Sequence, residues 1–211
     1  MIFDIFIVSA IGYAFGCLQW SYILIQWLKK EDVRKSGFGN AGASNTFVSY
    51  GKKLGISVAV LDALKALISV RLICFLIQIH WLSDHFYLVY LNALFVILGH
   101  NFPFFMGFKG GKGTASLVGI FIGLSPLYGF LSVFVILGIA VISNYIAVGT
   151  IGLLLYFILF TYLKGYGGVC LTISLLISWM SVYLHLPNFR RIRTGEESKV
   201  RTSFSKSKEE K

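Results

Sequence analysis

Charge is almost absent from a long part of this chain, since Lys164 is the only charged residue between Thr114 and Leu184. A helix needs about 20 mostly apolar residues to cross a bilayer, and a backbone in lipid must pair its polar groups internally. Over the whole chain 56% of the residues are hydrophobic and 13% are charged, whereas soluble domains carry about 25% charged residues. The sequence therefore predicts an all-α, polytopic membrane helical bundle.

Polar and glycine-rich stretches divide the apolar sequence into about seven expected transmembrane helices. Breaks at Ser125-Pro126, Ser143-Asn144 and Lys164-Gly165 separate the last four, because proline and glycine pairs are typical of turns. Asp62 and Lys65 lie three residues apart in the second helix, so they share a face and can pair. We expect one transmembrane domain, residues 1–188, with helices over 2–28, 56–79, 86–98, 114–124, 127–142, 145–163 and 167–184, and a basic tail, residues 189–211.

The distribution of Lys and Arg predicts the orientation of the bundle. With seven helices, the basic stretches 29–55 and 99–113 share a side with the tail, and positively charged loops stay in the cytoplasm. The N-terminus is then outside and the C-terminus cytoplasmic. Without the short helix 114–124 the tail would lie outside, against this bias. The net charge of +10 is thus assigned to contact with the inner leaflet and not to nucleic-acid binding.

The first polar loop, residues 34–46, holds three glycines among asparagines and small hydroxyl residues. Such a loop can present backbone N–H groups to an anion. A flexible linker between two helices would have the same composition, so composition alone leaves both interpretations open. The candidates for anion binding are Gly39, Asn40, Gly42 and Asn45.

The second polar loop places two lysines around a glycine pair, in Lys109-Gly110-Gly111-Lys112-Gly113, after Gly99-His100-Asn101-Phe102-Pro103. Glycine lets a backbone come close to a ligand, and ammonium groups beside free N–H groups suit a phosphate. The loop is not a Walker A motif, because Met106 and Gly113 stand where that motif needs Gly and Ser or Thr. A positively charged turn at the membrane surface is the alternative.

The third polar stretch follows the last expected helix and contains His185, Asn188, Arg191 and Glu196. An unperturbed histidine titrates at about pH 6.5, so it can exchange protons near neutrality. A single histidine at a membrane surface often has no catalytic role, but an asparagine and an arginine beside it favour one. Because the three stretches share a side, the sequence predicts one phosphate-handling site there. The cysteines, Cys17, Cys74 and Cys170, have no spacing typical of a metal site or a disulfide.

The order of these motifs resembles the PlsY family of bacterial acyl-phosphate:glycerol-3-phosphate acyltransferases. The resemblance implies transfer of a fatty acyl group from acyl phosphate to the 1-hydroxyl of glycerol 3-phosphate, without metal or other cofactor, in a multi-pass protein of the bacterial plasma membrane. The products are lysophosphatidic acid and phosphate. The matching segments are Asp32-Val33-Arg34-Lys35, Gly39-Asn40, Gly42-Ala43-Ser44-Asn45, Gly51-Lys52-Lys53, Leu61-Asp62-Ala63-Leu64-Lys65, the second loop, His185, Asn188, Arg191 and Gly195-Glu196.

The resemblance and the chemistry of the residues together suggest roles. His185 is the expected base or proton relay, and Asn188 orients it or the substrate. Asp62, Lys65 and Glu196 are expected to be structural, with Glu196 paired to a basic neighbour. The expected substrate- or phosphate-binding residues are Gly39, Asn40, Gly42, Asn45, His100, Lys109, Gly110, Gly111, Lys112, Gly113 and Arg191.

Four positions depart from the family pattern. Phe38 stands where the family has serine and Val48 where it has arginine, and Asn144 and Ala147 replace a second arginine and serine. One charge-assisted hydrogen bond contributes roughly 1.5–3 kcal/mol, so such losses would weaken phosphate binding. A divergent paralogue that binds a phosphorylated lipid with little or no turnover, and a small anion transporter, are the two alternatives.

Overall fold

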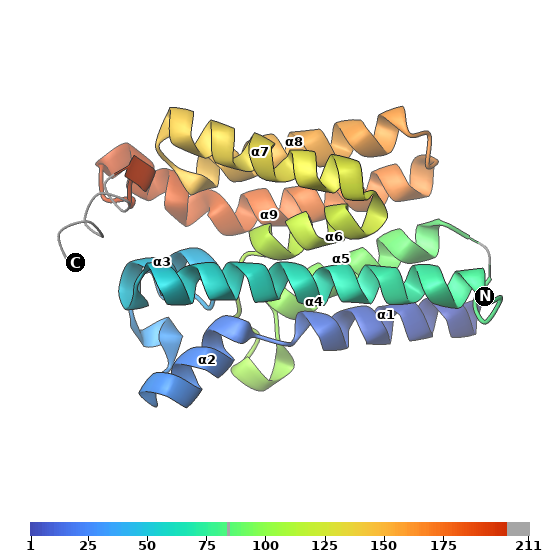
Figure 1. The fold of residues 1–211 in the computed structure, drawn as a ribbon, viewed down its shortest axis with the longest axis horizontal. Helices are drawn as coiled ribbons and strands as arrows, with labels where there is room; N and C mark the ends of the chain where they lie inside the picture. Colours follow the sequence, from blue (N-terminus) through green and yellow to red (C-terminus); the bar gives the residue numbers. More distant parts are fainter. Residues whose placement is uncertain (84, 202–211) are drawn as a thin grey trace.

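The computed structural model describes residues 1–83 and 85–201, and all regular elements in these residues are helices (Figure 1). The long helices run alternately in opposite directions, and the N-terminus lies at the opposite end of the bundle from the C-terminal end of α9. The elements are α1 Ile2–Gly16, α2 Trp20–Lys29, η1 Val33–Lys35, α3 Ala43–Tyr50, α4 Lys52–Gln78, α5 Tyr87–Asn101, η2 Phe104–Met106, α6 Thr114–Leu124, α7 Pro126–Ser143, α8 Ile146–Leu163 and α9 Gly168–Thr194.

Five segments of the described chain are long and apolar enough to cross a membrane: Ile2–Lys29, Tyr87–Met106, Pro126–Ser143, Ile146–Leu163 and Gly168–Thr194. The predicted fold class, an all-α polytopic membrane bundle, is confirmed. Helix α4 has 27 residues and is about 40 Å long, but it carries three charged residues in its middle. Helix α6 has 11 residues and, at about 16 Å, reaches half-way through the hydrocarbon.

The predicted single helix 2–28 is wrong, because the structure divides it into α1 and α2 around Cys17. Polar side chains bind the carbonyl groups at this break and connect it to α5. The Lys65 ammonium of α4 donates to Gly16 O at 3.0 Å and to Leu18 O at 2.6 Å. Gln19 Nε2, at the break itself, donates to Gly16 O at 3.2 Å and to His100 O of α5 at 2.8 Å. Backbone inside a bilayer can leave the helix only where the protein supplies such partners. The break therefore depends on residues far away in the sequence.

The last predicted helix, 167–184, is too short, since α9 continues to Thr194 with Pro187 inside it. Proline removes one backbone donor, but the helix continues, and it ends only where Gly195 adopts a left-handed φ of 79°. The expected domain boundary after residue 188 thus falls within α9. As a result His185, Asn188 and Arg191 lie at successive three-residue steps along one helix, where side chains are neighbours.

The ends of the other helices lie closer to the predicted positions. The expected helix 114–124 coincides with α6. The one over 127–142 is one residue shorter than α7 at each end, and the one over 145–163 begins one residue before α8. Helix α4 begins at Lys52, four residues early, and α5 runs three residues further, to Asn101. The first polar loop also contains a short helix, α3, that the apolar pattern could not reveal.

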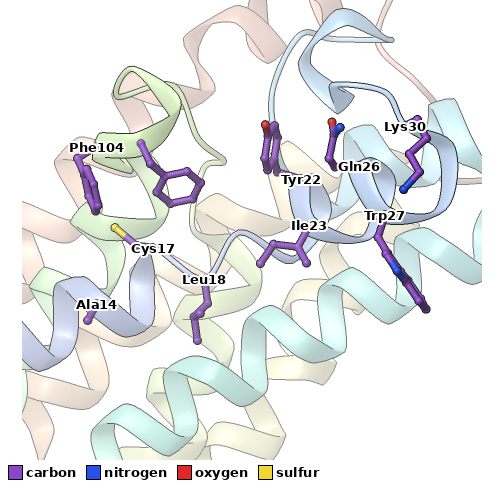
Figure 2. Close-up of a pocket in the computed structure, with 10 residues that line it drawn as sticks. Ala14, Cys17, Leu18, Tyr22, Ile23, Gln26, Trp27, Lys30 and Phe104 are labelled. Carbon is purple, nitrogen blue, oxygen red and sulfur yellow. The ribbon is translucent and has the colours of Figure 1, made fainter.

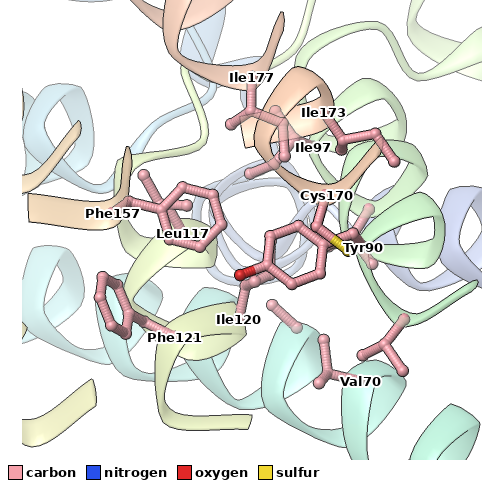
Figure 3. Close-up of a cluster of buried hydrophobic side chains, with 14 of the residues drawn as sticks. Val70, Tyr90, Ile97, Leu117, Ile120, Phe121, Phe157, Cys170, Ile173 and Ile177 are labelled. Atoms are coloured by element: carbon pink, nitrogen blue, oxygen red, sulfur yellow. The ribbon is translucent and has the colours of Figure 1, made fainter. Parts of the chain in front are cut away.

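Aromatic side chains and close helix contacts hold the bundle together (Figure 3). The Tyr90 ring stacks on Phe157 with centroids 5.9 Å apart, and its hydroxyl bonds to Thr161 Oγ1 at 2.8 Å. Helices α4 and α6 touch at Gly119, where an added Cβ would lie 1.9 Å from Ala63 O. Small residues permit such contact between membrane helices. This packing positions α6 and α9, which carry residues of the site.

Candidate active site

The first and second polar loops pack directly on each other. The Ala41 N–H donates to Gly110 O at 3.1 Å, and Arg34 Nη1 donates to Met106 O at 2.6 Å. The Asp32 carboxylate accepts from Arg34 at 2.7 Å, and this hydrogen bond lowers the pKa of Asp32. Two stretches that are about 70 residues apart in the sequence therefore form one layer at the end of the bundle.

Both asparagines of the first loop bind the loop itself. Asn45 is buried and accepts from Phe38 N at 2.6 Å, while its Nδ2 donates to the carbonyls of Val33, Ser36 and Asn40. Asn40 Oδ1 accepts from Gly42 N at 3.1 Å. The composition was also compatible with a flexible linker, but these bonds give the loop a defined shape. They leave Asn45 with no group free for a phosphate.

Four of the five glycines expected to offer N–H groups use them within the chain. Gly110 N and Gly111 N donate to Asn101 O and His100 O, both at 3.0 Å, and Gly39 N donates to Ser36 O. Gly42 N binds Asn40, as described above. In this structure these four amides therefore stabilise the loops, and a phosphate cradle built from them stays a prediction. Gly113 differs, because it caps α6 with φ of 81°, and the first N–H groups of a helix favour anions.

The glycine pair instead permits close packing on the end of α5. A Cβ on Gly111 would lie 2.2 Å from His100 Nε2, and one on Gly110 would lie 2.2 Å from His100 O. His100 cannot yield, because it is buried with its Nδ1 3.0 Å from Lys65 Nζ. Lys65 also pairs with Asp62 at 2.8 Å, which is the predicted ion pair. His100, expected to bind phosphate, thus belongs to a buried polar cluster beneath the loop.

We expect Gly111→Ala to destabilise the folded protein by about 1–3 kcal/mol, the usual cost of overpacking, because its methyl group overlaps the His100 ring. The matched control is Gly138→Ala in α7, where an added Cβ meets nothing within 4 Å and alanine favours the helix. The melting temperature of both variants should be measured. A Gly111→Ala protein as stable as Gly138→Ala would contradict the structure.

The second and third stretches meet in a polar network that we call the cationic cluster: Lys112, Asn188, Arg191 and Glu197. Lys112 Nζ donates to Asn188 Oδ1, and Asn188 Nδ2 donates to Glu197 Oε1 at 2.9 Å. Arg191 Nε donates to Glu197 Oε2 at 2.8 Å. The expected structural glutamate, Glu196, is exposed and accepts instead from Thr194 Oγ1 at 3.0 Å. The residue that pairs with a basic neighbour is therefore Glu197.

The first loop reaches the cationic cluster through Phe38, whose ring lies 4.3 Å from the Arg191 guanidinium carbon. All three polar stretches thus converge at one end of the bundle. Burial lowers the pKa of Lys112 to about 8, and the nearby Arg191 charge acts in the same direction, while Glu197 opposes them. The cluster is therefore a partly desolvated cationic site, which favours a bound anion.

His185 lies one turn before Asn188 on α9 and is buried. Its Nδ1 donates to Ser181 O at 2.8 Å, because a carbonyl only accepts. In the neutral ring this bond leaves Nε2 as the acceptor, which is the form of a general base. His185 and Asn188 are neighbours on one face of α9, and Asn188 accepts a hydrogen bond from Lys112, so the histidine lies next to the cationic cluster.

The remaining sequence candidates lie apart from the cluster. Lys109 is exposed on the loop surface. Val48 is 45% exposed. Asn144 caps α7 and accepts from the Arg201 N–H at 2.8 Å, and Ala147 is buried in α8.

An apolar groove of about 730 Å³ lies between α1, α2 and η2 (Figure 2). Cys17, Leu18 and Phe104 are among its lining residues, and Lys30 lies at one end. Its walls match the hydrocarbon of a lipid. No member of the cationic cluster lines the groove, so it is a separate feature of the surface.

Fold and site together define a polytopic α-helical membrane protein with a buried histidine beside a cationic cluster. Residues 6–195 match the sequence model described as glycerol-3-phosphate acyltransferase, and the chain belongs to that family. The resemblance seen in the sequence is thereby confirmed.

Relatives match the chain over nearly its full length. Glycerol-3-phosphate acyltransferase 1 of Oceanobacillus iheyensis is 39% identical over 95% of this chain and 97% of its own. Glycerol-3-phosphate acyltransferase 2 of Thermotoga maritima is 38% identical over 90% of this chain and 93% of its own. The crystal structure of PlsY, an integral membrane glycerol 3-phosphate acyltransferase, in its glycerol 3-phosphate form matches with a TM-score of 0.81 and 31% identity, over 92% of this chain and 94% of that one.

Proposed function

We propose that this protein transfers a fatty acyl group from acyl phosphate to the 1-hydroxyl of glycerol 3-phosphate, giving lysophosphatidic acid and phosphate. The observation that carries the proposal is the placement of His185 one turn before Asn188 on α9, next to the cationic cluster that Asn188 forms with Lys112, Arg191 and Glu197. Support also comes from PlsY, for which crystal structures of a glycerol 3-phosphate form and a lysophosphatidic acid form are known. Both proposed substrates are phosphates, and the cationic cluster supplies the charge that binds them.

In the proposed reaction His185 Nε2 accepts the proton of the 1-hydroxyl, and the oxygen attacks the acyl carbonyl carbon. A new C–O ester bond forms, the C–O bond to phosphate breaks, and phosphate leaves with the bonding electrons. Phosphate is a good leaving group, so positioning and charge stabilisation contribute more than a strong nucleophile. Lys112, Arg191 and the N-terminus of α6 at Gly113 supply that charge, and Asn188 holds Lys112 in place.

We also propose that the helical bundle, including α9 to Thr194, forms the catalytic domain of a multi-pass protein in the bacterial cell membrane. The N-terminus is outside, and the end of the bundle that carries the basic loops and the cationic cluster faces the cytoplasm. The clustering of Lys and Arg at this end supports the orientation. The acyl chain then stays in the bilayer while the phosphorylated groups remain at the wet surface.

The test is to incubate the purified protein with palmitoyl phosphate and labelled glycerol 3-phosphate. We expect labelled lysophosphatidic acid and equimolar phosphate. A protein that binds glycerol 3-phosphate but forms no product, beside an active relative, would instead be the divergent paralogue that Phe38 and Val48 suggest. Flux of an anion through liposomes without acyl transfer would identify a transporter and overturn the proposal.

A further inference from the structure

Phe38 occupies a constrained position between two glycines. Gly37 and Gly39 have φ of 57° and 73°, a region that residues with a side chain rarely adopt. The Phe38 N–H donates to Asn45 Oδ1 at 2.6 Å. The loop therefore holds this phenylalanine at one place, with its ring on the Arg191 guanidinium at 4.3 Å.

The Arg191 guanidinium is fixed on two sides, and one of its groups has no partner. Its Nε donates to Glu197 at 2.8 Å, and the Phe38 ring covers the group. Within the described residues its Nη2 is buried and has no hydrogen-bond partner. Buried donors in proteins are nearly always paired, so this N–H group is a candidate to bind a ligand oxygen.

The chemistry of the cluster indicates what kind of acceptor the Nη2 group would bind. Glu197 supplies one negative charge to two cations, Lys112 and Arg191, since Asn188 is neutral. Lys112, Arg191 and Glu197 together therefore carry a net positive charge. An anionic oxygen beside Glu197 would neutralise this charge and accept a hydrogen bond from Arg191 Nη2. A guanidinium can stack on an aromatic face while its N–H groups bind a phosphate in its own plane.

We propose that Phe38 is a positioning residue that determines affinity for the phosphorylated acceptor. Its ring fixes the Arg191 guanidinium so that Nη2 meets the phosphate of glycerol 3-phosphate. This inference rests on the proposed function, which places that phosphate at the cationic cluster. Phe38 touches Arg191 and not the reacting atoms, so its removal should change binding more than turnover.

The test compares Phe38→Leu, which keeps an apolar side chain without an aromatic face, with Phe38→Tyr, which keeps the ring. Glycerol 3-phosphate binding should be measured by calorimetry, independently of turnover, and KM and kcat by product formation. We expect Phe38→Leu to raise Kd and KM about 2- to 30-fold, the range of cation–π interactions, with little change in kcat. Phe38→Tyr should bind as wild type does, and melting temperatures should be equal.

Arg191→Lys provides the second arm, because lysine lacks the planar group that stacks on the ring. In that background Phe38→Leu should have no further effect on binding. Equal or tighter binding by Phe38→Leu, or the same loss in both backgrounds, would overturn the role of Phe38 while leaving the acyltransferase proposal intact. A wild-type protein that forms product and shows no Phe38 effect therefore refutes this inference alone. A wild-type protein that does not bind glycerol 3-phosphate refutes both.

Discussion

His185→Ala should lower kcat by about 100- to 10,000-fold, the usual contribution of a general base. The Nδ1 donation to Ser181 O at 2.8 Å orients the ring and leaves Nε2 for the substrate hydroxyl. The affinity for glycerol 3-phosphate should change little, because the proposed phosphate ligands are Lys112 and Arg191 and not His185. The rate of lysophosphatidic acid formation gives kcat, and calorimetry gives the affinity for glycerol 3-phosphate.

The matched control is His80→Asn, which changes an exposed histidine after α4, at the other end of that helix from the first polar loop. His80 has a φ of 56°, and asparagine accepts this conformation more readily than most residues. We expect the control to retain wild-type activity. A His185→Ala protein with more than about a tenth of the wild-type kcat would exclude His185 as the general base, by the same magnitude.

Lys112→Met should raise KM for glycerol 3-phosphate about 10- to 150-fold, which corresponds to one charge-assisted hydrogen bond. Lys112 is partly desolvated beside Asn188 and Arg191, so its charge is poorly screened. The control is Lys109→Met, three residues earlier and exposed, where solvent and salt weaken the interaction. Similar losses in both variants would mean that the general charge of the loop, and not the placed ammonium, binds the phosphate.

The lowered pKa of Lys112 predicts that kcat/KM depends on pH. Burial and Arg191 lower its pKa to about 8, so the ammonium that binds phosphate is present below pH 8 and is lost above it. The wild-type kcat/KM, which reports the free enzyme, should fall about tenfold per pH unit above this value. Arg stays charged in this range, so Lys112→Arg should remove the fall. A wild-type profile that stays flat above pH 8 would contradict the assignment.

The class of fold and the grouping of the polar loops follow from the sequence because each depends on local composition. Uncharged apolar runs form helices in lipid whatever their neighbours are. A spacing of three residues places Asp62 and Lys65 on one face, and they pair as expected. The motifs in both loops and after the last expected helix, with Lys112 and His185 among them, also identified the family that the comparisons show.

The end of α1 and the composition of the cationic cluster depend on contacts between segments that are distant in the sequence. Helix α1 ends at Gly16 because Lys65 and Gln19 both bind Gly16 O, and Gln19 also binds His100 O on α5. Glu197, and not its neighbour Glu196, enters the cationic cluster because the chain turns at Gly195, and no pattern in the sequence distinguishes two adjacent glutamates. The ring of Phe38 meets Arg191 across more than 150 residues of sequence.

The sequence by itself determined that this chain is a helical membrane protein with polar, phosphate-compatible loops at one end. Hydrophobicity, charge and glycine content are properties of single segments, and they act the same way in any context. Only the tertiary structure decided which polar groups are paired within the protein. The amides of Gly110 and Gly111 are used by α5, while Lys112 and Arg191 remain available, because hydrogen bonds between segments depend on where packing places each donor.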